Sequence, residues 1–199
     1  MTRIIAGTAK GRRLATPKGS ETRPTSDRVR EALFSAVEAW CGSLRGLRVL
    51  DLYAGSGALG LEAWSRGADH VTLVESDRRT AALIGANARD LGCDRAEIRA
   101  ATVTTTLSRS PAHPYDLVLS DPPYPLATEA VVADLVALRD HGWLGPGALV
   151  VVERSSRGVP LTWPDGLTAS RDRRYGETVL WYGHAGPDDP ATDPQEGES

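Results

Sequence analysis

The stretch Val49-Leu-Asp-Leu-Tyr-Ala-Gly-Ser-Gly-Ala-Leu-Gly60 decides the fold of this chain. The apolar run at residues 47–51 predicts a short buried strand, and the residues after the glycines predict a helix over 61–66. Glycine lets the backbone adopt positive φ and approach a ligand closely. A glycine-rich turn between a strand and a helix is typical of doubly wound α/β proteins that bind nucleotide-like ligands.

Strands and helices alternate on both sides of this turn. Further strands are predicted at residues 71–75, 96–100, 115–120, 148–153, 167–174 and 177–182, and helices at residues 27–41, 77–91 and 128–141. Thr25 or Ser26 is expected to cap the first helix. Alternation of this kind implies a mostly parallel sheet covered on both faces, with the last two strands as an antiparallel edge. We therefore predict an α/β fold with a doubly wound, mostly parallel, seven-stranded Rossmann-like sheet.

The spacing of the glycines narrows the class of ligand. Gly55, Gly57 and Gly60 match G-x-G-x-x-G, and Glu75 lies 20 residues after Gly55, at the end of the second strand. A carboxylate there can accept both hydroxyls of a ribose. The spacing alone admits a nicotinamide dinucleotide as readily as S-adenosylmethionine. Asp51 favours the second, because a carboxylate at the end of the first strand would repel a pyrophosphate but suits the ammonium group of a methionine moiety.

A second motif, Asp121-Pro-Pro-Tyr124, follows the fourth strand. Ligands of doubly wound sheets bind at the carboxyl ends of the strands, so this motif is expected to face the glycine turn. Its chemistry suits methyl transfer to a planar amino nitrogen. Asp121 and the carbonyl of Pro122 can each accept one N–H and neutralise developing positive charge. Pro123 removes a competing donor and stiffens the loop, and Tyr124 offers a face on which a base can stack.

Charge is distributed unevenly along the chain. The net charge is −3, but residues 1–30 carry eight bases and two acids, and residues 186–199 carry five acids and no base. A basic arm on an acidic body suggests a polyanion held at one edge, although 21 of the 23 basic residues are arginine, which also fits biased codon usage. The residues predicted from this charge pattern to contact nucleic acid are Arg3, Lys10, Arg12, Arg13, Lys18, Arg23, Arg28 and Arg30.

Composition excludes several classes of protein. Hydrophobic residues make up 41% of the 199 residues and charged residues 25%, an ordinary globular balance. Two cysteines cannot form a disulfide scaffold, and the four histidines have no metal-ligand spacing. No apolar run approaches the ~20 residues that span a bilayer. We therefore expect a cytoplasmic monomer with no metal and no membrane partner.

The motifs resemble class I S-adenosylmethionine-dependent amino-methyltransferases, and within them the RsmD family, which modifies guanine N2 in small-subunit ribosomal RNA. The resemblance covers about residues 3–183, and it is carried by residues 3–14 with 23–34, by residues 49–63 and by Asp121-Pro-Pro-Tyr124. The implied catalytic residues are Asp121, Pro122, Pro123 and Tyr124. The implied cofactor-binding residues are Asp51, Tyr53, Ala54, Gly55, Ser56, Gly57, Glu75, Ser76, Thr102 and Val103.

One departure concerns the adenine of the donor. Related enzymes often carry Asp or Asn after the third strand, whereas this chain has Ala100-Ala-Thr-Val103, so Thr102 or a backbone carbonyl is the substitute. The resemblance also implies that residues 25–28 close over the pocket. The predicted organisation is a basic, RNA-contacting extension at 1–26, a methyltransferase domain at 27–185 and a disordered acidic tail at 186–199.

The leading hypothesis is therefore methylation of guanine N2 in 16S ribosomal RNA, with the base extruded into the Asp121–Tyr124 pocket and the RNA or an assembling small subunit as partner. Four rivals remain: a DNA adenine or cytosine methyltransferase, a protein glutamine methyltransferase, a non-catalytic RNA-binding assembly factor, and a dinucleotide oxidoreductase. No separate domain for reading DNA fits in 199 residues, and glutamine methylation usually goes with Asn-Pro-Pro-Tyr. A dinucleotide oxidoreductase lacks a catalytic Tyr-x-x-x-Lys pair here.

Overall fold

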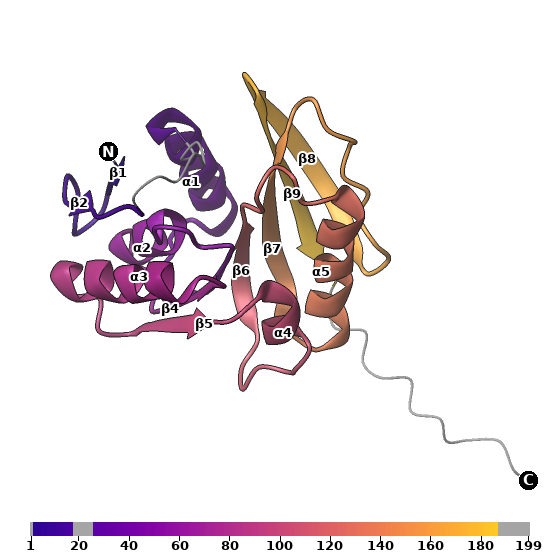
Figure 1. Ribbon diagram of the computed structural model, residues 1–199. Coiled ribbons are helices and arrows are strands. Elements are labelled where there is room, and N and C mark those ends of the chain that lie inside the picture. Colours follow the sequence, from indigo (N-terminus) through magenta and orange to yellow (C-terminus); the bar gives the residue numbers. More distant parts are fainter. Residues whose placement is uncertain (1, 18–25, 187–199) are drawn as a thin grey trace, which may run out of the picture.

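A computed structural model describes residues 2–17 and 26–186 (Figure 1). The helices are α1 (Asp27–Cys41), α2 (Ala58–Ser65), α3 (Arg78–Leu91), α4 (Val103–Leu107) and α5 (Thr128–Asp140). The strands are β1 (Thr2–Arg3), β2 (Arg13–Leu14), β3 (Arg48–Leu52), β4 (His70–Glu75), β5 (Ala96–Ala100), β6 (Tyr115–Ser120), β7 (Leu144–Ser155), β8 (Leu167–Tyr175) and β9 (Thr178–Ala185). No helix in these two ranges is long and apolar enough to cross a bilayer.

A seven-stranded sheet forms the centre, in the order β5-β4-β3-β6-β7-β9-β8. The strands from β5 to β7 run parallel, and β9 pairs antiparallel with both β7 and β8. The strand order reverses between β3 and β6, so the carboxyl ends of these two strands open a crevice there. The predicted α/β fold and the predicted antiparallel edge are both confirmed.

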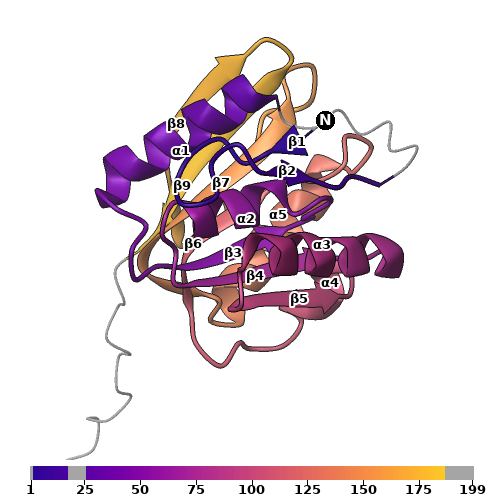
Figure 2. The same ribbon diagram turned by 90° about the vertical axis from the view of Figure 1, so that its left-hand side faces the viewer.

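Helices cover both faces of the sheet (Figures 1 and 2). Side chains of α1, α2 and α3 share one buried apolar cluster with one face, and side chains of α4 and α5 share another with the opposite face. Burial on both faces explains why β3 and β6 read as continuous apolar runs rather than as alternating patterns.

Several boundaries differ from the sequence prediction. β7 begins at Leu144 and ends at Ser155 instead of spanning 148–153, because pairing with β6 and β9 extends a strand through a glycine- and proline-containing start that carries no strand signal. The five-residue helix α4 and the two-residue strands β1 and β2 were not predicted. Helix α4 contains three threonines, which are weak helix formers, and its start depends on the Thr102 cap.

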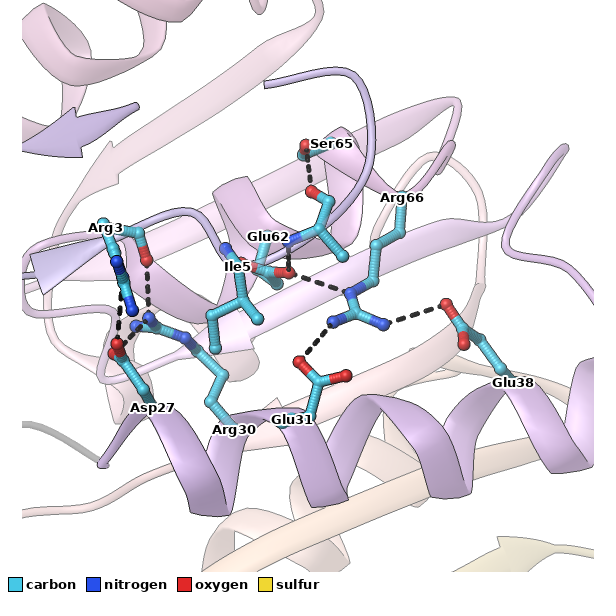
Figure 3. Close-up of polar contacts among 10 residues, drawn as sticks. Arg3, Ile5, Asp27, Arg30, Glu31, Glu38, Glu62, Ser65 and Arg66 are labelled. Carbon is cyan, nitrogen blue, oxygen red and sulfur yellow. Dashed lines mark hydrogen bonds and ion pairs between the residues drawn. The ribbon is translucent and has the colours of Figure 1, made fainter. Parts of the chain in front are cut away.

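The N-terminal arm, residues 2–17, packs onto α2. Its side chains Ile4, Ala9 and Leu14 are buried in the same apolar cluster as α1 and α2. The backbone N–H groups of Ile5 and Ala6 donate to the two carboxylate oxygens of Glu62, at 2.7 and 2.9 Å, and Glu62 is fully buried (Figure 3). A buried carboxylate therefore fixes the path of the arm.

Arg66 connects this carboxylate to α1. Its guanidinium donates to Glu62 at 2.8 Å, to Glu38 at 3.0 Å and to Glu31 at 3.4 Å, and it lies over the ring of Phe34. Figure 3 shows this network between α1, α2 and the arm. The charge of Glu62 is thus compensated inside the protein, which a buried carboxylate requires.

Candidate active site

A cavity of about 720 Å³ lies at the carboxyl ends of β3, β4 and β6. This volume falls within the range of small-molecule and cofactor sites. All residues that were predicted to have a cofactor-binding or catalytic role line the cavity, apart from Gly57. Gly57 faces the apolar side chains of Leu61, Leu73 and Ile84 instead. The lining residues are Thr2, Thr16, Pro17, Arg30, Asp51, Tyr53, Ala54, Gly55, Ser56, Ala58, Leu59, Val74, Glu75, Ser76, Thr102, Val103, Thr104, Asp121, Pro122, Pro123, Tyr124 and Leu126.

Asp51 presents a buried carboxyl group to this cavity. Its Oδ2 accepts the backbone N–H of Gly60 at 2.8 Å, and its Oδ1 is buried without a hydrogen-bond partner. Burial raises the pKa of this carboxyl to about 8, and the charges of Asp121 and Glu75 act in the same direction. A buried polar atom without a partner is uncommon, so Oδ1 is a ready acceptor for a cationic donor in the cavity.

The glycines bring backbone close to this carboxylate. Gly57 caps the N-terminus of α2 in the left-handed region, with φ of 82°. A Cβ at Gly60 would lie 2.8 Å from Leu73 Cδ2 and 3.1 Å from Asp51 Oδ2. The glycine at position 60 therefore allows α2 to start directly against β3 and β4.

Glu75 ends β4 with a carboxylate held by neighbouring donors. Its Oε2 accepts the backbone N–H of Gly55 at 3.0 Å, and its Oε1 accepts the N–H of Asp77 at 2.8 Å and the hydroxyl of Ser76 at 3.4 Å. These contacts fix its orientation at the cavity wall. Three of the four acceptor sites of the carboxylate are used, so Oε2 can receive one hydroxyl group directly, and a second can replace the long 3.4 Å contact of Ser76 on Oε1.

Tyr53 has an unusual backbone and a specific partner. It is the one non-glycine residue with positive φ in the described ranges, at 61°, and its hydroxyl donates to Asp134 of α5 at 2.5 Å. Burial raises the pKa of the Tyr53 hydroxyl, and the hydrogen bond to Asp134 raises it further. Burial also raises the pKa of Asp134. This contact ties the glycine turn to the helix that follows the second motif.

The Asp121–Tyr124 loop forms the opposite wall. Pro122 is buried, whereas Tyr124 is 49% exposed, so its ring lies at the mouth of the cavity. The Pro123 carbonyl accepts the N–H of Leu126 at 2.9 Å. Arg154, at the end of β7, donates to the Leu126 carbonyl at 2.7 Å. The loop is therefore anchored at its far end by a residue that sequence analysis did not single out.

Arg154 also acts on the loop through its charge. Burial lowers the pKa of its guanidinium, while the nearby charges of Tyr53 and Asp121 oppose that shift. Because Arg154 ends a strand in the middle of the sheet, its position relative to Asp121 is set by the pairing of β6 with β7.

Thr102 and Val103 reach the cavity through the start of α4. The Thr102 hydroxyl accepts the backbone N–H of Thr105 at 3.1 Å and donates to the Thr105 hydroxyl at 2.8 Å. Its hydrogen is therefore used in the helix cap rather than directed at a ligand. Adenine presents its amino group as a donor, and Thr102 Oγ1 still has one unused acceptor site. Thr102 and the backbone carbonyls at 102–103 therefore both stay predictions for adenine recognition.

The described bases that were predicted to contact RNA divide into an exposed group and the buried Arg30. Arg3, Lys10, Arg12, Arg13 and Arg28 are exposed, and Arg12 donates to the Asp90 carbonyl at 2.6 Å. The positions of Lys18 and Arg23, and Thr25 of the segment expected to close over the pocket, lie outside the described residues. Ser26 caps α1 by accepting the N–H of Val29.

Arg30 requires a correction. Its side chain is only 1% exposed, and its guanidinium donates to the Arg3 carbonyl at 2.5 Å and to Asp27 at 3.0 Å (Figure 3). It lies on the same helical face as Leu33 and Phe34, which explains its burial. Arg30 therefore holds the arm to α1 and lines the cavity, and it is not the exposed phosphate contact that the charge pattern predicted.

Sequence analysis missed part of the cavity wall. Thr2, Thr16 and Pro17 line it because the arm folds back over the strand ends, and no local pattern reports such a long-range contact. Among the described residues, no three His, Cys, Asp or Glu side chains are grouped as in a metal site.

Comparison with known proteins gives consistent results. The family described as Conserved hypothetical protein 95 matches residues 2–184. Ribosomal RNA small subunit methyltransferase D of Escherichia coli K12 is 36% identical over 183 residues, which cover 89% of this chain and 86% of that protein. The solved structure of yhhF from Escherichia coli is 31% identical, with a TM-score of 0.82 over 93% of this chain and 98% of that one.

A more distant structure shares the fold alone. Magnesium protoporphyrin IX methyltransferase of Synechocystis, solved with bound SAM, is 16% identical, with a TM-score of 0.60 over 80% of this chain and 81% of that one. The arrangement of strands and helices around the cavity is therefore shared well beyond close relatives.

Proposed function

We propose, from the premise that this chain belongs to the RsmD family described as Conserved hypothetical protein 95, that it transfers a methyl group from S-adenosylmethionine to guanine N2 in small-subunit ribosomal RNA. The relatives that are named ribosomal RNA small subunit methyltransferase D support the class of substrate. The cavity supports the donor and the type of acceptor, by the chemistry of the residues that line it.

One observation carries the proposal: a buried carboxylate oxygen without a partner, Asp51 Oδ1, shares a cavity with Glu75 and with Asp121. Asp51 suits the ammonium group of the donor, and Glu75 suits its ribose hydroxyls. Asp51 lies against the first turn of α2, where a dinucleotide would place its pyrophosphate. A carboxylate there repels a pyrophosphate, which favours S-adenosylmethionine over a dinucleotide. When bound, S-adenosylmethionine supplies a methyl group activated by a sulfonium sulfur.

The protein's own part in the reaction is to position a poor nucleophile. An exocyclic amino nitrogen has a delocalised lone pair. Asp121 accepts one of its N–H groups, and we assign the second acceptor to the Pro122 carbonyl, because the Pro123 carbonyl already accepts the Leu126 N–H. These two acceptors turn the lone pair toward the methyl group and stabilise the positive charge that develops on nitrogen.

The exposed ring of Tyr124 gives the base a stacking surface at the mouth of the cavity. A guanine within a helix has to leave its stack to reach Asp121, so base flipping is part of the proposal. Exposed bases of the arm, among them Lys10, Arg12 and Arg13, are expected to contact phosphates, and binding should weaken with salt.

The test is transfer of radiolabelled methyl from S-adenosylmethionine, followed by nucleoside analysis. The acceptors are small ribosomal subunits from cells that lack this protein, naked ribosomal RNA, and DNA. We expect label in N2-methylguanosine from subunits or RNA, and loss of transfer in Asp121→Ala with RNA binding retained. Label in DNA refutes the substrate class. Equal transfer by the Asp121→Ala variant refutes the catalytic assignment.

A further inference from the structure

A second cavity lies between the end of α1 and the β8–β9 hairpin, away from the strand ends that form the first. Its volume is about 210 Å³. The walls come from Ala36, Ala39 and Trp40 of α1 and from Leu149, Ser170, Arg171, Tyr182 and His184 of the sheet. Figure 2 shows α1 running across the face of β8 and β9. None of these residues takes part in the proposed chemistry.

We propose that this cavity binds an unpaired nucleotide of the RNA substrate, with the base inside and its phosphate at the rim. The inference rests on the proposed function, because it adds a second contact to the same substrate. The volume is below the range for drug-sized ligands, so a single heterocycle is the appropriate class of occupant.

The walls offer aromatic surface to a planar ring. Trp40 is 37% exposed, one of three large hydrophobic side chains exposed within the described residues. Its ring lies 6.1 Å from the ring of His184, at 38°. Small side chains at Ala36 and Ala39 keep the space beside it open. Proteins that bind single-stranded nucleic acid use exposed aromatic side chains of this kind as surfaces on which bases stack.

One wall residue of the cavity carries a buried polar group without a partner. The Tyr182 side chain is 2% exposed, and its hydroxyl is buried without a hydrogen bond. Burial raises the pKa of this hydroxyl to about 12, so it stays protonated and can both donate and accept.

Positive charge stands at the rim. Arg171 is exposed, and its guanidinium lies 4.9 Å from the centre of the Tyr182 ring. Arg173 is the next residue on the same face of β8 and is also exposed. Because β8 is the edge strand of the sheet, this side of the cavity is open to a long partner. A base with an attached phosphate matches both the aromatic wall and the charge, whereas a second copy of this acidic chain does not match the charge.

The experiment measures RNA binding and donor binding separately. We expect Trp40→Ala and Arg171→Gln each to raise the dissociation constant of naked small-subunit RNA at least fivefold, since base stacking of this kind is worth about 5- to 150-fold. The dissociation constant of S-adenosylmethionine should stay within twofold of wild type. The matched control is Arg174→Gln, which removes the same charge from the opposite face of β8 and should change RNA binding less than twofold.

A third variant guards against loss of folding. Ala39→Glu places a carboxylate into the cavity at an exposed helical position, and it should weaken RNA binding as much as Trp40→Ala does. Ultraviolet crosslinking should also attach RNA to peptides from residues 31–41 or 167–182. The inference is overturned if Trp40→Ala and Ala39→Glu bind RNA with the same affinity as the control, Arg174→Gln. It is also overturned if the wild type is a dimer that Ala39→Glu dissociates. If the wild type binds RNA through this cavity but transfers no methyl group, the proposed function is refuted and this inference is not.

Discussion

The carboxylate of Asp51, at the end of β3, accepts the backbone N–H of Gly60, in the first turn of α2, at 2.8 Å. This contact holds Oδ2 against the helix and leaves the other oxygen, Oδ1, without a partner. The helix terminus thus sets the position of the group that we assign to the donor's ammonium. It does so only because position 60 has no side chain, since a Cβ there would approach both Asp51 and Leu73.

Gly60→Ala should therefore lower the affinity for S-adenosylmethionine by at least tenfold. The added Cβ would lie 2.8 Å from Leu73 Cδ2 and 3.1 Å from Asp51 Oδ2, so either the helix or the carboxylate has to move. Isothermal titration of the folded variant with S-adenosylmethionine gives the affinity. Gly85→Ala in α3 is the control, because its Cβ would have only the tip of Arg89 within reach, at 3.5 Å.

The Gly85→Ala control is expected to change stability but not donor binding. Glycine inside a helix is less favourable than alanine by about 0.8–1 kcal/mol, so Gly85→Ala should raise the free energy of unfolding and leave donor binding unchanged. If both alanine variants bind S-adenosylmethionine as wild type does, the close approach at Gly60 is unimportant for the site.

Asp51 also makes stability depend on pH. Its pKa is raised to about 8 in the folded protein, mainly by burial, against about 3.9 in the unfolded chain. Between these values the folded state holds a proton that the unfolded state has released. The free energy of unfolding should therefore fall as pH rises from about 4 to 8, by up to about 1.4 kcal/mol per pH unit from this group.

Urea denaturation at several pH values without ligand measures this dependence. The side chain of the Asp51→Asn variant cannot ionise, so the variant should lack the contribution of this group to the pH dependence. The difference in unfolding free energy between variant and wild type should therefore favour the variant more at pH 8 than at pH 5. A wild type and a variant whose stabilities change with pH in parallel would contradict the raised pKa.

Much of the fold was predictable because its signals are local. The strands β5 and β6 have the predicted bounds, since both are short segments bounded by turns or loops, and β6 is also rich in apolar residues. The hairpin of β1 and β2 was not predictable, because two-residue strands carry no periodicity. Its position depends instead on Glu62. A charged residue in an otherwise apolar helix indicates burial with a partner, but the sequence does not identify that partner.

The site shows the same division between local and long-range information. Asp51, Glu75 and Asp121 stand at strand ends, so topology alone brings them to one cavity. Arg154 also ends a strand, but its contact with the Leu126 carbonyl depends on the shape of the intervening loop. The burial of Arg30 had a local signal that charge counting overlooked, namely its place on the apolar face of α1.

Arg154 is expected to be a positioning residue for the Asp121–Tyr124 loop. Arg154→Met keeps an unbranched apolar side chain but removes both the charge near Asp121 and the hydrogen bond to Leu126. The value of kcat should fall about tenfold, while the dissociation constant of S-adenosylmethionine stays close to wild type. Arg154→Lys should recover part of the rate, because it restores the charge but not the planar donor. A variant that loses donor binding in proportion to rate would show a general structural role instead.

Glu62 should be the main anchor of the N-terminal arm. Glu62→Gln removes the charge that faces Arg66 and turns an amide N–H₂ toward backbone donors, which should cost about 3–5 kcal/mol of unfolding free energy. Trypsin should then cleave faster at Lys10, Arg12 and Arg13. Glu38→Gln removes an exposed partner of the same arginine and should cost about 1 kcal/mol or less. Similar losses in the two variants would mean that the buried carboxylate has no special role.

The exposed bases of the arm should control the salt dependence of RNA binding. Replacing Arg12 and Arg13 together by Gln removes two exposed positive charges of the arm, and each phosphate contact contributes about 0.7–0.9 to the slope of log affinity against log salt. The slope should therefore decrease by up to about 1.8, and the two proteins should bind more nearly alike as salt increases. Arg109→Gln with Arg157→Gln is the charge-matched control, because both residues are exposed and neither belongs to the arm or to the described residues that line the first cavity. An equal change in slope in both double variants would mean that net charge, rather than the position of the arm, governs binding.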